Sequence, residues 1–264
     1  MITDEKKNII FGYPRMENTN IQFLGKNNIL YFESKDIRIV NSSVIFKGNN
    51  SCVVIGGNNT PIKINLIVYH NSSVFLGRNL WTTNAFELNA GESRNILIGD
   101  DCLISGQCYA RTTDSHMIYS AKTFRRTNEG KSIYVGDHVW ICKGVAILKG
   151  SRIHSGSIIG SHSVVTGKEI MSNTIWGGNP ARLIKDDIFF DSMGTHDLDI
   201  SRMKRFSVCD ENKAQSFIFE NDSSNLSFEE IDKNLCEAND AGARLDILKK
   251  ILKYNNKNRF AKKL

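Results

Sequence analysis

Residues 135–171 read VGDHVW ICKGVA ILKGSR IHSGSI IGSHSV VTGKEI M, in units of six that each begin with an apolar residue. This register holds Val135, Ile141, Ile147, Ile153, Ile159, Val165 and Met171, and the fifth position of most units is small or β-branched: Val139, Val145, Ser151, Ser157 and Ser163. A period of six fits neither an α-helix nor an ordinary strand. It is typical of the hexapeptide repeat, in which the coils of a parallel β-helix stack and bury a continuous apolar column.

The same repeat extends upstream in weaker form. Ile98 and Ile104 are followed by Cys102 and Cys108, and a fainter trace begins at Leu76. Residues 1–75 contain short strand-like runs that are separated by Asn- and Gly-rich turns. We therefore predict that they form irregular early coils of the same solenoid, because terminal repeats are usually atypical.

Composition limits the classes of function. The 264 residues carry a net charge of +6, which suits an anionic ligand. No apolar run is long enough to span a membrane, and the N-terminus does not resemble a secretory signal. The six cysteines are scattered without a CxxC pair, so we expect a cytoplasmic protein with structural thiols. We expect no nucleic-acid partner, because no basic stripe is interleaved with aromatic residues.

The repeat is interrupted at residues 110–134. An insertion cannot enter the stack of coils, so it must project as a loop from one face. This loop carries His116 and the pair Arg125-Arg126. Loops on rigid scaffolds often carry function, which makes this segment a candidate site.

The repeat ends near residues 177–182, and the composition then shifts. We therefore divide the chain into a β-helix domain (1–186) and a C-terminal extension (187–264). The extension begins with polar, irregular sequence and a possible short strand at 217–219. Ser227 opens a capping box, so we predict mostly helix from residue 227. Gly242 is expected to split or bend an amphipathic stripe formed by Ile231, Leu235, Ala238, Leu245, Leu248 and Leu252. The basic end, residues 249–263, is interpreted as a solvated face, with a partner or membrane role as the alternative.

Four segments together resemble the hexapeptide acyltransferases: residues 135–141, 144–150 and 159–166, and Gly178-Asn179-Pro180-Ala181-Arg182-Leu183-Ile184, which is similar to the family's closing G-x-P-A-R-x-I signature. The resemblance implies an all-β, left-handed parallel β-helix of hexapeptide repeats with a projecting loop and a small α-helical C-terminal extension. Handedness comes from the resemblance, since parallel crossovers are otherwise usually right-handed. It also implies a homotrimer with acetyl-CoA in the groove between neighbouring subunits.

Within that family, the chain most resembles the bacterial sialic acid O-acetyltransferases of capsular polysaccharide. The match is Thr112-Thr113-Asp114-Ser115-His116 in the insertion and Trp140 on the following coil. The resemblance makes His116 and Trp140 the functional pair. An alcohol is a poor nucleophile and needs a base, and His can accept a proton near neutral pH, so His116 is the candidate general base.

Two neighbouring positions leave alternatives open. Asp114 either orients the imidazole of His116 or caps the turn. Trp140 precedes a core residue, so its side chain points outward and needs a partner. The resemblance makes this partner the acceptor sugar or the thioester arm of acetyl-CoA, and the alternative is burial under the inserted loop or at a trimer contact.

The candidate cofactor residues also follow from the resemblance. Ser161 and Thr166 match positions that contact the pantetheine arm, Gly160 lies beside them, and Lys143 matches a polar position after Trp140. The run 165–170 is one residue longer than the family's usual V-T-K-D-I. The phosphate ligand therefore stays open among Lys168, Arg182 and Lys185, each of which could equally be a surface charge.

The acceptor candidates lie on or beside the inserted loop. Arg111 and Arg125, with Lys122 and Arg126, make it basic, which suits an acidic glycan such as polysialic acid or else a solvated loop. Asp114 and Ser115 complete the set of substrate-binding candidates. No metal is expected, because His138, His154 and His162 lack the ligand spacing of the related zinc-binding β-helices.

These inferences predict an acetyl-CoA-dependent O-acetyltransferase that modifies a hydroxyl of sialic acid in a capsular or other surface polysaccharide. We expect direct transfer, because no Cys or Ser is placed as a covalent carrier. One alternative is an acetyltransferase for another sugar, a nucleotide sugar or an amine. The other is a metal-dependent or non-catalytic β-helix protein.

Overall fold

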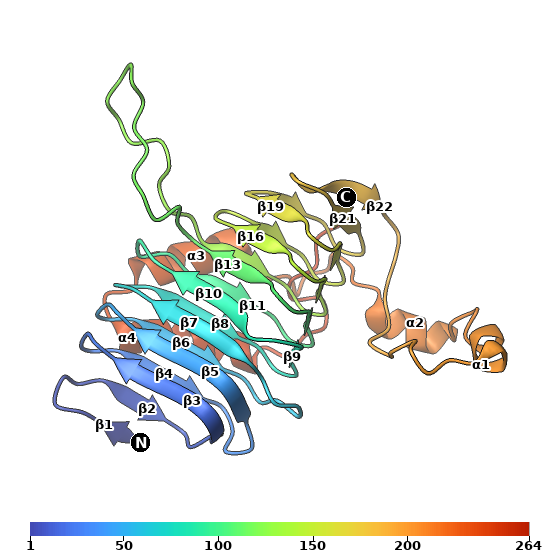
Figure 1. Ribbon diagram of the computed structural model, residues 1–264, viewed down its shortest axis with the longest axis horizontal. Helices are drawn as coiled ribbons and strands as arrows, with labels where there is room; N and C mark the ends of the chain where they lie inside the picture. Colours follow the sequence, from blue (N-terminus) through green and yellow to red (C-terminus); the bar gives the residue numbers. More distant parts are fainter. Residues whose placement is uncertain (264) are drawn as a thin grey trace.

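The computed structural model describes residues 1–263 and shows a three-sided parallel β-helix (Figure 1). Its first sheet contains β1 (Ile2–Thr3), β2 (Ile9–Phe11), β4 (Ile29–Phe32), β6 (Cys52–Ile55), β8 (Ser73–Leu76), β11 (Ile96–Ile98), β14 (Ile133–Val135), β17 (Arg152–Ile153) and β20 (Glu169–Ile170). The second sheet contains β3 (Arg15–Phe23), β5 (Arg38–Phe46), β7 (Ile64–Val68), β10 (Phe86–Ala90), β13 (Tyr109–Arg111), β16 (Ala146–Leu148) and β19 (Val164–Thr166). The third sheet contains β9 (Trp81–Thr82), β12 (Leu103–Ile104), β15 (Trp140–Ile141), β18 (Ile158–Ile159), β21 (Ile175–Gly177) and β22 (Arg182–Lys185).

The predicted repeat register forms the core. Val135 pairs with Ile153, and Ile147 pairs with Val165, so one coil consists of three units of six residues. The fifth-position side chains are fully buried, including the three serines. One position was wrong: Ile153 pairs with Ile170, which is fully buried, while Met171 is only half-buried. The last coil is one residue shorter, which moves Ile170 into the core.

Up to residue 263, the C-terminal extension contains four helices: α1 (Ile200–Arg205), α2 (Glu211–Phe217), α3 (Phe228–Glu237) and α4 (Ala241–Lys253). The predicted strand at 217–219 was wrong, because Phe217 ends α2 and the chain then turns extended at Ile218. The Ser227 hydroxyl caps α3 as expected. The break between α3 and α4 lies at residues 238–240, where Asp240 caps α4, and Gly242 is inside that helix.

Helices α3 and α4 cover the outer face of the first sheet. The rings of Tyr134 and Phe228 stack with centroids 5.3 Å apart, and Cys52, Phe75 and Leu97 are buried beneath the two helices. In Figure 1 these helices lie behind the strands, whereas α1 and α2 extend away from the solenoid. The outer surfaces of the second and third sheets are therefore the faces that can carry a site.

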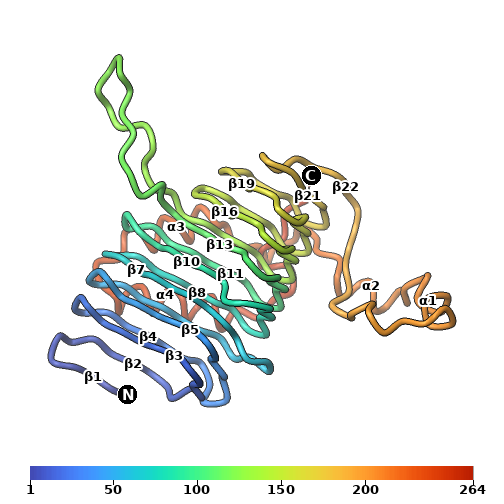
Figure 2. The backbone as a smooth tube through the Cα atoms, in the orientation of Figure 1, coloured from blue at the N-terminus to red at the C-terminus, as the bar shows by residue number. Residues whose placement is uncertain are grey.

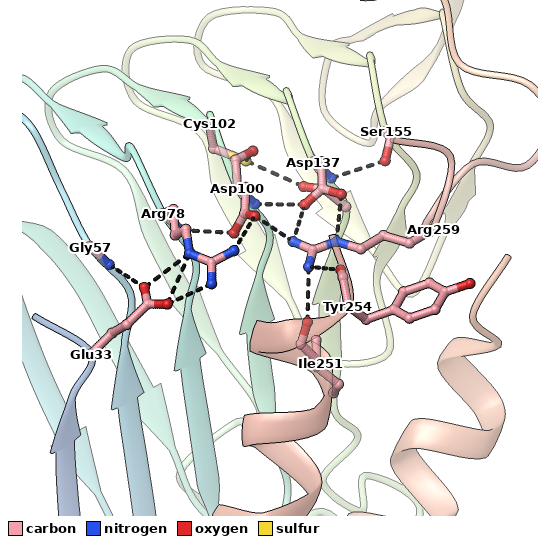
Figure 3. Close-up of polar contacts among 11 residues, drawn as sticks. Glu33, Gly57, Arg78, Asp100, Cys102, Asp137, Ser155, Ile251, Tyr254 and Arg259 are labelled. Atoms are coloured by element: carbon pink, nitrogen blue, oxygen red, sulfur yellow. Dashed lines mark hydrogen bonds and ion pairs between the residues drawn. The ribbon is translucent and has the colours of Figure 1, made fainter. Parts of the chain in front are cut away.

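A buried ionic cluster fastens the chain end to the corner between the first and third sheets (Figure 3). The Arg259 guanidinium reaches the carboxylates of Asp137 and Asp100 and also donates to the backbone carbonyls of Ile251 and Tyr254. Arg78 approaches Asp100 from the neighbouring coil and binds Glu33. These contacts fix the extension relative to the coils that carry Trp140.

Candidate functional site

The insertion forms a projecting arm, residues 112–132, slightly shorter than the predicted loop because β13 and β14 include residues at both ends (Figure 2). Tyr119 and Arg126 form an antiparallel bridge within it. At its base, the Thr112 hydroxyl is buried and bonded to Gly91, and Arg126 Nη2 lies 2.6 Å from Glu92 Oε1. The arm therefore resembles a hairpin, and contacts with Gly91 and Glu92 fix it to the solenoid.

His116 lies on this arm with an exposed side chain. Its backbone carbonyl accepts a 2.7 Å hydrogen bond from Asn128 Nδ2, which also donates to Asp114 at 3.0 Å. The Asn128 side chain is buried, so it holds the two sides of the arm together. Sequence reasoning missed Asn128, because an Asn in a loop gives no signal of burial.

Asp114 contacts Lys149 on the following coil. The Lys149 ammonium binds its carboxylate, and this hydrogen bond keeps the pKa of Asp114 below its ordinary value. Among the described residues, the hydrogen bonds of the carboxylate go to Lys149 and Asn128. The carboxylate therefore anchors the arm, a role that differs from both of those predicted from the sequence, orienting the imidazole and capping the turn.

Trp140 lies on β15 of the third sheet and points outward, with 37 % of its surface exposed. Leu103 pairs with both Trp140 and Trp81, so these three side chains form one outward column. The Phe190 ring centroid is 5.8 Å from that of Trp140. A groove of about 1170 Å³ runs along this column, and residues 191–196 of the extension form one of its walls.

His138, beside Trp140, has a packing role. Its ring stacks on Phe190 at 4.1 Å and on Phe217 at 4.9 Å, and Nε2 donates to the Phe190 carbonyl at 2.9 Å. Burial lowers the pKa of His138, so the neutral form is favoured. This stack holds the extension against the groove.

Most of the predicted cofactor residues lie on the side of Trp140. Lys143 follows β15, and the backbone of His162 bonds to Lys143, which places Gly160 and Ser161 at the same corner on the next coil. Arg182 and Lys185 lie on β22, two strands beyond β18, which pairs with β15. Ile175 pairs with Lys185 and with Ile158, which pairs with Trp140, so this row crosses four strands over roughly 15 Å.

The other predicted residues lie on the opposite edge of the second sheet. Thr166 ends β19, and Lys168 follows it at the corner where the arm is anchored. Arg111 ends β13 and stacks over the Tyr109 ring at 5.2 Å, and Ser115 lines a small cavity of about 360 Å³ at the arm base. Arg125 is exposed farther along the arm. The His116 side and the Trp140 side are therefore separated by the second sheet within one chain.

Sequence reasoning missed Trp81 and Phe190. Trp81 belongs to the Trp140 column, but the coils between them differ in length and include the arm, so counting by six does not align them. Within residues 1–263, no three His, Cys, Asp or Glu side chains are grouped to hold a metal ion. In the same residues, no helix is both long and apolar enough to cross a membrane.

Comparisons with known proteins agree with this architecture. The family model for the bacterial transferase hexapeptide (six repeats) matches residues 132–167. The polysialic acid O-acetyltransferase of Neisseria meningitidis is 31 % identical over 127 residues, 48 % of this chain and 58 % of that protein. The polysialic acid O-acetyltransferase of Escherichia coli O1:K1 / APEC is 38 % identical over 132 residues, 50 % and 42 % of the two chains. The chain thus spans about half the length of these curated relatives.

Two solved structures are similar over a longer range. The crystal structure of the polySia-specific acetyltransferase NeuO is 31 % identical, with a TM-score of 0.65 over 75 % of this chain and 93 % of that one. The polysialic acid O-acetyltransferase OatWY is 27 % identical, with a TM-score of 0.55 over 72 % and 94 %. The first similarity confirms the predicted left-handed parallel β-helix.

Proposed function

This chain belongs to the bacterial hexapeptide-repeat transferases, and from that premise we propose that it transfers acetyl from acetyl-CoA to a hydroxyl of sialic acid in a capsular or other surface polysaccharide. The observation that carries the proposal is the likeness to a polySia-specific acetyltransferase over nearly all of that structure. The exposed imidazole of His116 on the arm can act as a base, and the outward-facing indole of Trp140 in the groove can bind the substrates.

His116 is the proposed general base. The imidazole accepts the proton of the sugar hydroxyl as the oxygen–acetyl carbon bond forms and the carbon–sulfur bond breaks, and the proton then passes to the leaving thiolate. Arg111 and Arg125 form no ion pair among the described residues, so they are available for the carboxylate of an acidic sugar. Asp114 and Ser115 would shape the acceptor side near the arm base.

The residues present fit acetyl-CoA along the Trp140 side of the solenoid. Trp140, Lys143, Gly160 and Ser161 offer an apolar surface and polar groups for the pantetheine arm. Arg182 and Lys185 are exposed farther along the same sheet and offer positive charge for the phosphates. In this arrangement the coenzyme supplies the activated acetyl group, and the chain's side chains bind and orient it.

We propose that the active protein is a homotrimer. The His116 side and the Trp140 side occupy opposite edges of the second sheet, so one chain does not bring them together. A cyclic assembly would place the arm of one subunit against the Trp140 side of the next. Thr166 and Lys168 lie on the arm side, so they would contact the coenzyme held by the adjacent subunit.

The first experiment measures thiol release from acetyl-CoA with oligosialic acid and with neutral oligosaccharides as acceptors. His116→Ala is expected to lower sialic-acid-dependent release by roughly 10²-fold or more. Met117→Ala is the control for truncating an exposed side chain of the arm, because Met117 follows His116 directly and is 64 % exposed. Acceptor-independent release, or full activity in His116→Ala, would contradict the proposal.

We also propose that the protein is located in the cytoplasm. All six cysteines are free. Two of them, Cys102 and Cys108, are buried in the solenoid core, and Cys52 is buried between the solenoid and the extension's helices. Free thiols suit a reducing compartment.

A further inference from the structure

The groove beside Trp140 extends well beyond that residue. Its floor is the column Trp81, Leu103 and Trp140 on three adjacent strands, with Trp81 53 % exposed. Strands in a sheet lie about 4.8 Å apart, so the two tryptophans stand on strands roughly 10 Å apart. A volume of about 1170 Å³ leaves room for more than one sugar ring. The exposed parts of the two indole side chains, on either side of Leu103, offer an extended aromatic surface, which we call the platform.

One edge of the platform is a row of neutral and acidic polar side chains. Asn79 and Asp101 both have left-handed backbone conformations, with φ of 54° and 57°, at the same corner of successive coils. Asn59 donates to Asn79 at 3.1 Å from the preceding coil. All three residues are exposed. Amides and carboxylates beside an aromatic face can donate to and accept from sugar hydroxyls.

The charges in the groove disfavour an anionic ligand. Four carboxylates line it, those of Asp100, Asp101, Asp137 and Asp191, against the cations Arg259 and Lys257. Arg259 pairs with Asp137 and Asp100, and Asp191 pairs with Lys213. Lys257 donates to the Gln215 carbonyl and lies 5.6 Å from the Phe219 ring. Among residues 1–263, the lining charge that has no ion pair and no such contact is therefore the carboxylate of Asp101. This part of the groove is thus unsuited to the phosphates of acetyl-CoA or to the carboxylate of sialic acid.

We propose that the Trp81 end of the groove binds an uncharged pyranose residue of the acceptor glycan, stacked on the Trp81 indole next to the sialic acid that receives the acetyl group. This inference rests on the proposed function. It divides the recognition of the acceptor between two surfaces. The acidic sugar meets Arg111 and Arg125 of the arm side, and the neutral sugar meets the aromatic floor of the Trp140 side.

The test compares oligosaccharides in which sialic acid alternates with a neutral hexose against oligosialic acid of equal length. Trp81→Ala is expected to raise the acceptor KM for the alternating oligosaccharide roughly 3- to 10-fold, the range expected for one aromatic stacking contact. The KM for oligosialic acid and for acetyl-CoA should stay unchanged. Trp81→Phe should keep most of the affinity. Tyr13→Ala is the control for removing an exposed aromatic side chain elsewhere, since Tyr13 is 60 % exposed.

A second measurement is independent of catalysis. Without acetyl-CoA, the alternating oligosaccharide should shift the indole N–H resonance of Trp81, which is identified by its absence in Trp81→Phe. No shift, an equal KM change for both acceptors, or a raised KM for acetyl-CoA would overturn the proposal. If the wild type acetylates neither acceptor but the Trp81 resonance shifts, the proposed function fails and the sugar site stands.

Discussion

Arg259 Nη2 lies 2.7 Å from Oδ1 of Asp137, although the two residues are 122 positions apart in the chain. Arg259 Nε donates to the other oxygen of the same carboxylate at 2.8 Å, so the contact is bidentate. The Arg259 side chain is almost completely buried, and so is Asp137. This pair connects the C-terminal extension to the coil that carries Trp140.

Removing the Arg259 charge should destabilise the protein strongly. Arg259→Met leaves Asp137 and Asp100 buried without their counter-ion, which we expect to lower the free energy of unfolding by about 3–5 kcal/mol in urea denaturation. Lys263→Met is the control, because the Lys263–Glu220 pair is largely exposed and should contribute less than about 1 kcal/mol. Similar losses of unfolding free energy in both variants would show that the buried Arg259 pair contributes no more to stability than the exposed Lys263 pair.

Stability should depend on pH through His138. Burial lowers the pKa of His138 in the folded state, so the unfolded chain binds the proton first. The stability contributed by neutral His138 is therefore present above about pH 6.5 and is lost as the pH falls through the lowered folded-state pKa. Asp101 and Asp191 face His138 and partly oppose this effect.

His138→Asn removes this titration and keeps a residue that tolerates the left-handed φ of 52°. Urea denaturation at several values between pH 7.5 and pH 5 should show a smaller loss of stability in the variant than in the wild type. Asp137, whose pKa burial raises to about 6, acts in the opposite direction and is present in both proteins. Identical dependence of stability on pH in the two proteins would contradict the role given to His138.

Mixing two inactive variants should restore activity if His116 and Trp140 act across a subunit boundary. His116→Ala and Trp140→Ala are each expected to be inactive as pure proteins. Co-expression should give mixed trimers in which about one quarter of the interfaces combine an intact arm with an intact Trp140. The thiol-release assay then measures the recovered rate. No recovery in verified mixed oligomers would mean that the two residues do not act together across the boundary.

Truncation after Leu226 should make the protein insoluble, or should make it bind a dye that reports exposed apolar surface strongly. It removes α3 and α4, which cover the apolar outer face of the first sheet, including Phe75 and Leu97. An exposed apolar sheet face of this kind promotes aggregation. Deletion of Ile200–Arg205 is the control, because no residue of α1 is buried, and it should leave solubility and the melting temperature unchanged. A truncated protein that is soluble and monodisperse would show that α3 and α4 are not needed to keep the first sheet from aggregating.

The inner half of this molecule could be predicted from its sequence. The side chains at the repeat positions face the axis of their own coil, so the apolar period of six specifies the core from Val135 to Val165 without knowledge of what lies outside. The single error, Met171 in place of Ile170, arose where the last coil is one residue shorter. Helix α3 was also recognisable, because a capping serine acts on the backbone three residues later.

The contacts between side chains on the outer surface could be identified only from the tertiary structure. Trp81, Leu103 and Trp140 form one column only because coils of unequal length and the arm come into register when they stack. Residues 217–219 do not form the expected strand. Instead, Phe217 and Phe219 pack against His138, which lies far away in the chain. The sequence by itself determined the solenoid, because each repeat carries its own inward-facing residues. Only the tertiary structure decided which outward-facing residues meet, because those contacts join segments separated by tens to more than a hundred residues and depend on the length of everything between them.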